Sequence, residues 1–497
     1  MCMHCLGKSF IAPVSLVTMK DLFAPVAWQG WLVAFTGIAA LVVGCSSSDE
    51  NVSSDDAALL DVAVTRGTST QKFQVAGRPD ELCVVPQHIV GADYDKDDSK
   101  SETELCSYNF YGAEPGKGVA VCPKLTSTNP GVDVMELVEG KDAAATQAEV
   151  CKLVDRPNRM LAKYKQSMTC SYSPAILGYY HLSRALGGIG SVKPAVVRTM
   201  DLEQHKKVTA AGVSFTKDLL QTLWKQYQSS EANPAASRYR DALYTTDLKQ
   251  IYGAMQENPR GETKYVDPIT GRSINVRGAT DYSSSFRATA AYQAMLDARP
   301  IKQWVPTTFA GSAQRITQMR DIADMVLIDT LLSQQDRFGN IHAVDYYYYQ
   351  EDGATKKIKK SKVDDGEKPK PEGAVVVREM LLKDNDCGVI KDNVAKKAGM
   401  LGQIRHMSPK TYKHLRWLSA NFGVGTEIPK FMSREALFTQ ADINTLRKNL
   451  AEAEASMVSR CRSGQLLLDL DIGSHLSTTS PAPAVNACDA IEAPKPE

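Results

Sequence analysis

The sequence predicts an α+β protein with a β-rich N-terminal part, a mainly helical C-terminal part and disulfide bonds. Short β-forming runs alternate with Gly, Asp, Asn and Pro turns between residues 73 and 142, whereas helical patterns dominate residues 406–472. With 497 residues, 43% hydrophobic and 23% charged, the chain has the composition of a soluble globular protein of roughly two to three domain equivalents. Its net charge of +1 argues against a nucleic-acid-binding protein.

The N-terminus has the features of a secretory signal. An apolar run from Trp28 to Gly44 ends at Cys45. A charged start, an apolar core and a small residue before the cleavage site are typical of such signals. Met19-Lys20 supplies the charged start better than Met1, so residue 19 is an alternative start. The run is short for a membrane span. An uncleaved anchoring helix is the alternative, and both interpretations place the body of the protein outside the cytoplasm.

The end of the apolar run, Val42-Val-Gly-Cys45, resembles a bacterial lipobox. This resemblance implies that residues 1–44 are a signal peptide and that Cys45 is a lipidated mature N-terminus, which anchors the protein to a membrane of the cell envelope. Ser46, in place of an acidic residue, implies the outer membrane of a two-membrane bacterium, facing the periplasm or the exterior. Residues 45–72 begin Ser- and Asp-rich and predict a flexible tether.

Apart from Cys2 and Cys5 in the signal segment and the lipidation site Cys45, the chain has eight cysteines, and these predict disulfides. An even number of cysteines in an exported chain is typical of disulfide bonding. Cys2-Met-His-Cys5 lies in the predicted signal segment, and no Cys-x-x-Cys pair occurs among the other cysteines, which argues against a zinc ribbon and against thioredoxin-like chemistry. The eight residues are Cys83, Cys106, Cys122, Cys151, Cys170, Cys387, Cys461 and Cys488.

Residues 73–150 form a cysteine-containing β-rich region. The runs 81–85, 118–122 and 131–137 are rich in β-forming residues and predict strands. Residues 112–118 carry glycines and a lysine in an arrangement close to a phosphate-binding loop. They have one residue too few between the glycines and lack the Ser or Thr after the lysine, so they predict a turn.

Residues 151–300 begin with strand and helix signals. Residues 160–165 alternate and predict a strand that carries Lys163 and Lys165. A helix over 174–186 ends at Gly187-Gly188, and residues 192–198 are β-forming again. Residues 201–300 are largely helical by pattern, with a marked turn at 258–262.

The most informative stretch runs from Arg320 to His342. Ile322, Met325, Val326 and Leu332 recur at helical spacing and predict a helix with one buried stripe, which also carries Asp329. A polar loop over 335–340 follows, and residues 342–349 are rich in β-forming residues.

A second loop follows a further strand. Residues 374–382 predict a strand that leads to Lys383-Asp-Asn-Asp-Cys-Gly388, for which a simple hairpin turn is the alternative interpretation. The charged run over 351–373 predicts a solvated hairpin tip. The mainly helical part closes the segment 301–472, and residues 473–497 predict a loose tail.

The order of these elements resembles the catalytic half of the secretory-pathway Golgi casein kinase family and of its HipA-like and phosphatidylinositol-kinase-like relatives. That order is a buried helix, an Asp-Arg-x-x-Asn loop, a hairpin and an Asp-bearing loop. The lysine strand and the helix after it resemble the small lobe of the same kinases. The resemblance implies a two-lobed, atypical protein-kinase-like fold with a small β-rich N-lobe and a mainly helical C-lobe. Residues 151–300 would be the nucleotide-binding lobe with a helical insertion, and residues 301–472 the catalytic C-lobe.

The resemblance also implies roles for individual residues. ATP and Mg²⁺ or Mn²⁺ would be the cofactors. We expect Cys387 to stay unpaired because it lies inside the metal motif. The implied roles are Asp336 as the catalytic carboxylate, Lys163 and Lys165 on the nucleotide phosphates, Asn340 with Asp384 or Asp386 on the metal, and Asp329 and Arg337 as supports of the loop.

The chain departs from the kinase pattern at three positions. The helix over 174–186 has no carboxylate where the pattern places a Glu, near Ile176. Phe338 stands where the family has His, and Asn340 follows Asp336 by four residues instead of five. The absent helix Glu favours an inactive protein, whereas the intact set of Asp336, Asn340 and Asp384 favours a kinase. We expect an exported kinase acting on a hydroxyl of a protein, peptide or glycan. The alternatives are a catalytically inactive kinase-like scaffold or regulator, and a surface-binding lipoprotein.

Overall fold

A computed structural model describes residues 66–112, 116–126, 128–276, 281–351, 357–363, 369–476 and 488–489. The predicted signal peptide, the lipidation site Cys45 and most of the tether and tail lie outside these residues. Within the described ranges, no helix is both long enough and apolar enough to span a membrane.

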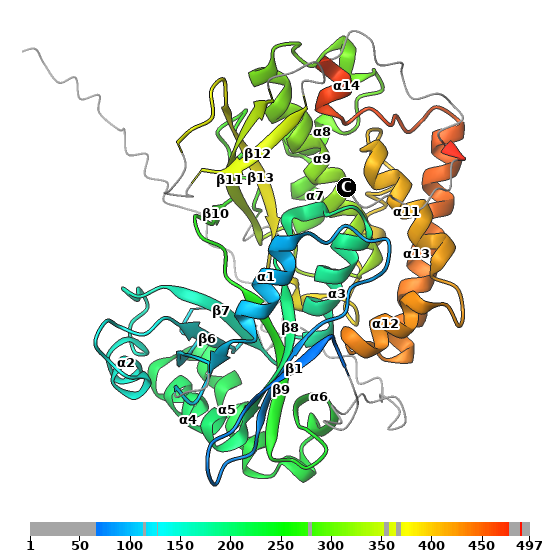
Figure 1. The fold of residues 1–497 in the computed structure, drawn as a ribbon. Helices are drawn as coiled ribbons and strands as arrows, with labels where there is room; N and C mark the ends of the chain where they lie inside the picture. Colours follow the sequence, from blue (N-terminus) through cyan, green and yellow to red (C-terminus); the bar gives the residue numbers. More distant parts are fainter. Residues whose placement is uncertain are drawn as a thin grey trace, which may run out of the picture. The chain divides into compact units, whose positions relative to one another are not determined.

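A seven-stranded antiparallel sheet dominates the N-terminal half (Figure 1). Its order is β1-β2-β8-β9-β7-β6-β5, so β1 and β5 are the edges. The sheet takes strands from both predicted regions, 73–150 and 151–300. The strands are β1 (Ser69–Phe73), β2 (Glu81–Val85), β5 (Ala120–Pro123), β6 (Val132–Met135), β7 (Met160–Lys165), β8 (Ala195–Asp201) and β9 (Gln250–Glu257), and a separate pair joins β3 (Tyr108–Asn109) to β4 (Lys117–Gly118).

Helices cover this sheet, and one of them is central. Every residue of α3 (Ser173–Ala185) is buried, and α3 contacts β8 and β9. Gly178 of α3 allows the Phe438 ring to pack directly on this helix, because a Cβ added to Gly178 would lie 2.6 Å from that ring. The other helices of this half are α1 (Lys96–Leu105), α2 (Ala143–Val150), α4 (Leu202–Phe215), α5 (Asp218–Ala232) and α6 (Arg240–Leu243), with short 3₁₀ turns η1 (Ile189–Ser191) and η2 (Pro234–Ala236).

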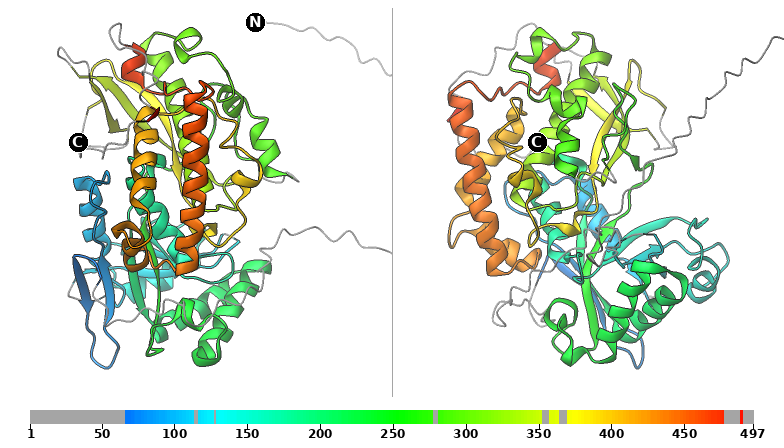
Figure 2. Two further views of the ribbon diagram at one scale, coloured as in Figure 1. Left: turned by 90° about the vertical axis from the view of Figure 1, so that its right-hand side faces the viewer. Right: turned by 180° about the vertical axis from the view of Figure 1, so that it is seen from behind.

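A smaller four-stranded sheet lies in the C-terminal half. β11 (Ile341–Gln350) pairs with β10 (Thr263–Lys264), β12 (Ile358–Lys362) and β13 (Val375–Leu382). The long helix α9 (Phe309–Leu331) packs on β13, and α11 lies beside α13 (Figure 2). The remaining helices are α7 (Tyr282–Arg287), α8 (Ala290–Ala294), η3 (Ile301–Gln303), η4 (Asn385–Cys387), α10 (Val394–Lys397), α11 (Pro409–Asn421), α12 (Glu427–Glu435), α13 (Gln440–Arg462) and α14 (Ile472–Leu476).

Most predicted elements are confirmed, among them β7, α3, β11 and β13, so the protein is a mixed α and β structure. The prediction that residues 201–300 are largely helical is wrong for 250–257 and 263–264, which are strands, whereas the turn predicted at 258–262 is present between them. β9 pairs with β8 on one side and β7 on the other, and it is buried from Gln250 to Met255. A strand buried on both faces has no alternation, so its periodicity does not distinguish it from a buried helix.

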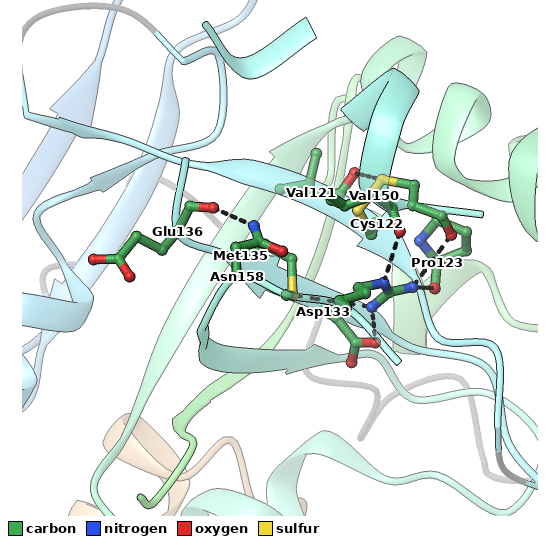
Figure 3. The surroundings of a disulfide bond; sticks show 10 residues. Val121, Cys122, Pro123, Asp133, Met135, Glu136, Val150 and Asn158 are labelled. Atoms are coloured by element: carbon green, nitrogen blue, oxygen red, sulfur yellow. Dashed lines mark hydrogen bonds and ion pairs between the residues drawn. A yellow bond between two sulfur atoms is a disulfide. The ribbon is translucent and has the colours of Figure 1, made fainter. Parts of the chain in front are cut away.

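Three disulfides that join described cysteines confirm the prediction of disulfide bonding. Cys83–Cys106 ties β2 to the end of α1, Cys122–Cys151 ties β5 to the end of α2, and Cys461–Cys488 pins part of the tail to α13. Beside the second bond, Arg156 donates to Asp133 at 2.6 Å and to the Pro123 carbonyl at 2.7 Å (Figure 3). Cys387 is free and buried, as expected. These bonds are consistent with an exported protein.

Peptide mapping without reduction should recover these three linkages. Burial raises the pKa of the Cys387 thiol, so its reactive thiolate is scarce in the folded protein. We therefore expect iodoacetamide to label Cys387 only after denaturation. Equal labelling of Cys387 before and after denaturation would contradict this. Replacing both Cys122 and Cys151 by Ala should lower the free energy of unfolding by about 3 kcal/mol, because the bond closes a long loop.

Candidate functional site

Lys165, at the end of β7, meets two carboxylates from the loop after β13. Its Nζ lies 2.8 Å from Asp386 Oδ1 and 3.4 Å from Asp384 Oδ1. Burial acts to lower the pKa of Lys165, but the charges of Asp386 and Asp384 outweigh it and raise that pKa. The structure thus brings together three of the residues that the sequence singled out, although more than 200 residues separate the lysine from its partners.

The loop that carries the two aspartates is held by backbone contacts. Asp384 has a left-handed backbone (φ 53°, ψ 49°), which turns the chain sharply before η4. Tyr172, just before α3, donates its N–H to the Asp386 carbonyl at 2.9 Å. The start of α3 is therefore attached to the aspartate loop.

A buried ion pair fixes the loop after α9. Arg337 Nε lies 2.9 Å from Asp329 Oδ2, and its guanidinium also donates to the Lys383 carbonyl at 2.8 Å and to Asn385 Oδ1 at 2.6 Å. The Tyr179 hydroxyl donates to Asp329 at 2.7 Å. Although burial acts to lower the pKa of Arg337, the charge of Asp329 raises it. One guanidinium thus joins α9 to the aspartate loop.

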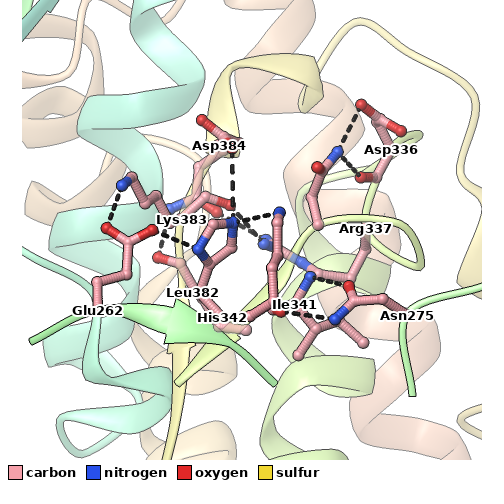
Figure 4. A network of polar contacts seen from close by, with 12 residues as sticks. Glu262, Asn275, Asp336, Arg337, Ile341, His342, Leu382, Lys383 and Asp384 are labelled. Atoms are coloured by element: carbon pink, nitrogen blue, oxygen red, sulfur yellow. Dashed lines mark hydrogen bonds and ion pairs between the residues drawn. The ribbon is translucent and has the colours of Figure 1, made fainter. Parts of the chain in front are cut away.

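The same loop displays Asp336. Its side chain is exposed, and Asn340 Nδ2 donates to Asp336 Oδ2 at 2.8 Å and to the Asp336 carbonyl at 3.0 Å. Asp336 lies on the loop that follows α9 and Asp384 on the loop that follows β13, and the two loops border the same region (Figure 4). Phe338 is buried and stacks on Phe286 with ring centroids 4.8 Å apart. It anchors the loop in the core.

Three further residues beside Asp384 were not predicted from the sequence. Glu262 contacts both His342 and Lys383, and His342 Nε2 lies 3.8 Å from Asp384 Oδ2 (Figure 4). Burial acts to raise the pKa of Glu262, but hydrogen bonds and charge from His342 and Lys383 hold it at about 2. His342 lies two residues after the Asp-Arg-x-x-Asn motif, which is a signal that could have identified it. Glu262 ends a predicted turn and has no such signal.

Positive charge surrounds Asp384. Burial acts to raise the pKa of this carboxyl, but Lys165, Lys163, Lys124 and Lys383 together hold it well below its usual value. Lys163 lies two residues before Lys165 and therefore projects from the same face of β7. The pKa of Asp386 is also lowered, chiefly by Lys165 acting against burial. Both carboxylates are charged at neutral pH.

The donor set fits a hard divalent cation. Asp386 Oδ2 is buried and has no hydrogen-bond partner, so one carboxylate oxygen next to Asp384 lacks a donor. Among the residues that the structure describes, no group of three or more His, Cys, Asp and Glu side chains forms a complete metal cluster. Mg²⁺ is commonly held by one or two carboxylates together with substrate phosphates and water, so two aspartates are sufficient.

Comparisons with known proteins give a weak likeness. No family model and no curated protein matches the chain. Two solved structures are similar over 73% of this chain and 76% of theirs, each with a TM-score of 0.35. They are the Golgi casein kinase, at 12% identity, and the Golgi casein kinase with Mn/ADP bound, at 11% identity. Likenesses this distant assign no function, which has to come from the residues of the site.

Removing Asp329 should strongly destabilise the fold. An Asp329→Ala variant leaves the Arg337 charge buried without its partner, and breaking a buried pair in this way lowers the free energy of unfolding by about 3–5 kcal/mol. Asp392→Ala is the matched control, because Asp392 pairs with Lys397 on the surface, where such pairs contribute about 0–1 kcal/mol. Urea unfolding of both variants checks this. Equal losses in the two would show that Arg337 does not depend on Asp329.

Proposed function

We propose that this protein is an exported atypical kinase that transfers the γ-phosphoryl group of ATP to a hydroxyl of a protein, peptide or glycan. The observation that carries the proposal is the meeting of Lys165 with Asp384 and Asp386, beside the loop that displays Asp336. Phosphoryl transfer needs cations on the phosphates, carboxylates for a metal and a carboxylate that orients the attacking hydroxyl. This site offers all three.

Each residue has a separate part in the proposal. Lys163 and Lys165 bind the nucleotide phosphates, and Asp336 accepts the proton of the acceptor hydroxyl. Mg²⁺ or Mn²⁺, when bound, would neutralise charge on the phosphates. Asp384 is the preferred ligand of that metal because its side chain is 26% exposed, whereas that of Asp386 is 4% exposed. Asn340 remains a predicted ligand, and its amide also orients Asp336.

Because α3 lacks the glutamate that orients the strand lysine in ordinary kinases, another carboxylate has to orient Lys165. In ordinary kinases a Glu on the helix orients the strand lysine, but α3 carries no carboxylate. Here Asp386 contacts Lys165 at the shorter distance, so we propose that Asp386 takes over the orienting part. The two aspartates then have different roles, because Asp386 orients Lys165 and Asp384 binds the metal.

A catalytically inactive scaffold or regulator is the second candidate. The observation that favours it is that Lys165 is already paired with both aspartates. A bound phosphate would have to draw the lysine away from at least one of them. In a kinase-like protein without catalysis, Lys165 would stay paired with both aspartates. The loop with Asp336 would then take no part in phosphoryl transfer.

Variants of Asp336 and Asp384 should fail differently. Asp336→Asn removes a group used mainly in the transition state, so nucleotide binding should survive while turnover falls by about 10² or more. Asp384→Asn removes a metal ligand, so metal-dependent nucleotide affinity should fall. Asp345→Ala is the control, since Asp345 pairs with Arg378 on the neighbouring strand, and it should change neither quantity. Phosphoryl transfer from labelled ATP and calorimetric binding with and without Mg²⁺ or Mn²⁺ measure these effects.

The outcomes separate the candidates. Wild-type protein that binds no nucleotide with any metal contradicts the kinase and leaves the scaffold. Binding without transfer to generic acceptors or to the protein itself is the result expected both of a kinase with another acceptor and of a catalytically inactive kinase-like protein. If Asp386→Asn, and not Asp384→Asn, abolishes the metal dependence, the assigned parts of the two aspartates are reversed.

We also propose that the site operates at the bacterial cell envelope, on a protein anchored through a lipid on Cys45. The three disulfides support export, and Val42-Val-Gly-Cys45 supports lipidation. Cys45→Ser should leave an uncleaved precursor and abolish labelling with a radioactive fatty acid. Ser46→Ala, which keeps the cysteine, should be processed normally. A mature N-terminus that maps to another residue would show that the lipobox interpretation is wrong.

A further inference from the structure

The hairpin between β5 and β6 carries a lysine that the proposed mechanism does not use. Lys124 follows β5 directly, and its N–H donates to the Gly131 carbonyl at 2.9 Å, which closes the hairpin at its base. β5 is an edge strand, and β6 lies between it and β7. Lys124 therefore lies two strands away from Lys165, and the hairpin turns at the end of the sheet where Lys165 lies.

Two contacts hold this hairpin against the site. A Cβ added to Gly131 would lie 3.6 Å from Lys165 Cγ and 3.9 Å from Lys124 Cδ, so the stems of both lysines reach the same glycine. Thr169, in the loop after β7, donates its hydroxyl to Asn129 Oδ1 at 3.1 Å. The loop with Thr169 continues to Tyr172, whose N–H is bonded to Asp386. The hairpin and the aspartate loop are thus fastened to the same segment.

Lys124 forms no direct ion pair with a described carboxylate, although the charge of Asp384 acts on it. In the part of the chain that the structure describes, the ion pairs include neither Lys124 nor Lys163, whereas Lys165 pairs with Asp384 and Asp386 and Lys383 pairs with Glu262. Lys124 is half-buried. Burial and then the charge of Lys165 lower its pKa to about 8, although Asp384 acts in the opposite direction. An ammonium group in such surroundings gains most from an anion that arrives from outside.

We infer that Lys124 is a phosphate-binding residue, and that the β5–β6 hairpin holds it over the phosphate chain of the bound nucleotide. The inference rests on the proposed function and adds a third lysine to it. Unpaired ammonium groups enter the site from two separate elements, the hairpin and β7. Two groups that enter from different elements fit a chain of phosphates better than a single phosphate. The ligand is therefore a chain of phosphates, which under the proposed function is that of a nucleoside di- or triphosphate.

The test compares nucleotides of different phosphate number on two variants and a control. Hydrogen bonds to charged groups contribute enough that losing one typically weakens binding by about 10-fold to 100-fold. Lys124→Met should weaken ATP and ADP by about tenfold and AMP by less than about threefold. Lys124→Arg keeps the charge and should stay within about threefold of wild type for all three ligands. Lys72→Met is the control, because Lys72 is exposed on β1, at the opposite edge of the same sheet.

Calorimetric binding to the full chain gives these affinities, and thermal unfolding of each variant checks the fold. Wild-type affinity of Lys124→Met for ATP would overturn the inference and leave the proposed function intact. An equal loss for ATP, ADP and AMP would also overturn it, because the residue would then act on the nucleoside or on the fold. A wild-type protein that binds neither ATP nor inorganic tripolyphosphate would overturn the proposed function and this inference together.

Discussion

The contact of Lys165 with Asp384 and Asp386 is the interaction on which the site depends. It joins β7 of the large sheet to the loop after β13, two segments that are distant in the chain. A buried ammonium group needs a carboxylate partner, since an unpaired buried charge is strongly unfavourable. It also fixes the strand register. A one-residue shift would exchange Lys165 with Tyr164, whose hydroxyl is bonded to the Arg198 and Ile251 carbonyls on the other face.

The second constraint is the Arg337 guanidinium. Its contacts with Asp329, the Lys383 carbonyl and Asn385 set the distance between the loop that carries Asp336 and the loop that carries Asp384. Arginine suits this position because its planar group presents several donors at fixed angles. Tyr179 on α3 completes the arrangement through Asp329. One buried network thus connects α3, α9 and both loops. A substitution of any of its members should therefore change the positions of the site residues.

Not every buried ion pair of this protein belongs to a site. Arg198 and Glu81 are fully buried, and the guanidinium lies between the Phe73 and Phe110 rings, 4.3 and 4.2 Å from their centroids. There each charge has its partner, and aromatic rings fill the space around the arginine. Around Asp384, in contrast, Lys124 and Lys163 add positive charge without carboxylates of their own. The difference between a closed pair and an excess of one sign is the physical reason to expect a ligand at the second place.

The sequence by itself determined the elements that carry the candidate site. Alternation marked β7, helical spacing marked α9, and the order of Asp336 and Asp384 followed from a loop, a hairpin and a second loop, because these signals are local. Only the tertiary structure decided that Asp386 lies closest to Lys165, that Phe338 is a core residue, and that Lys124, Glu262 and His342 border Asp384. These facts depend on contacts between distant segments, and a single sequence holds no local pattern for such contacts. The central strand β9 was missed for a related reason, since burial on both faces erases the alternation by which a strand is recognised.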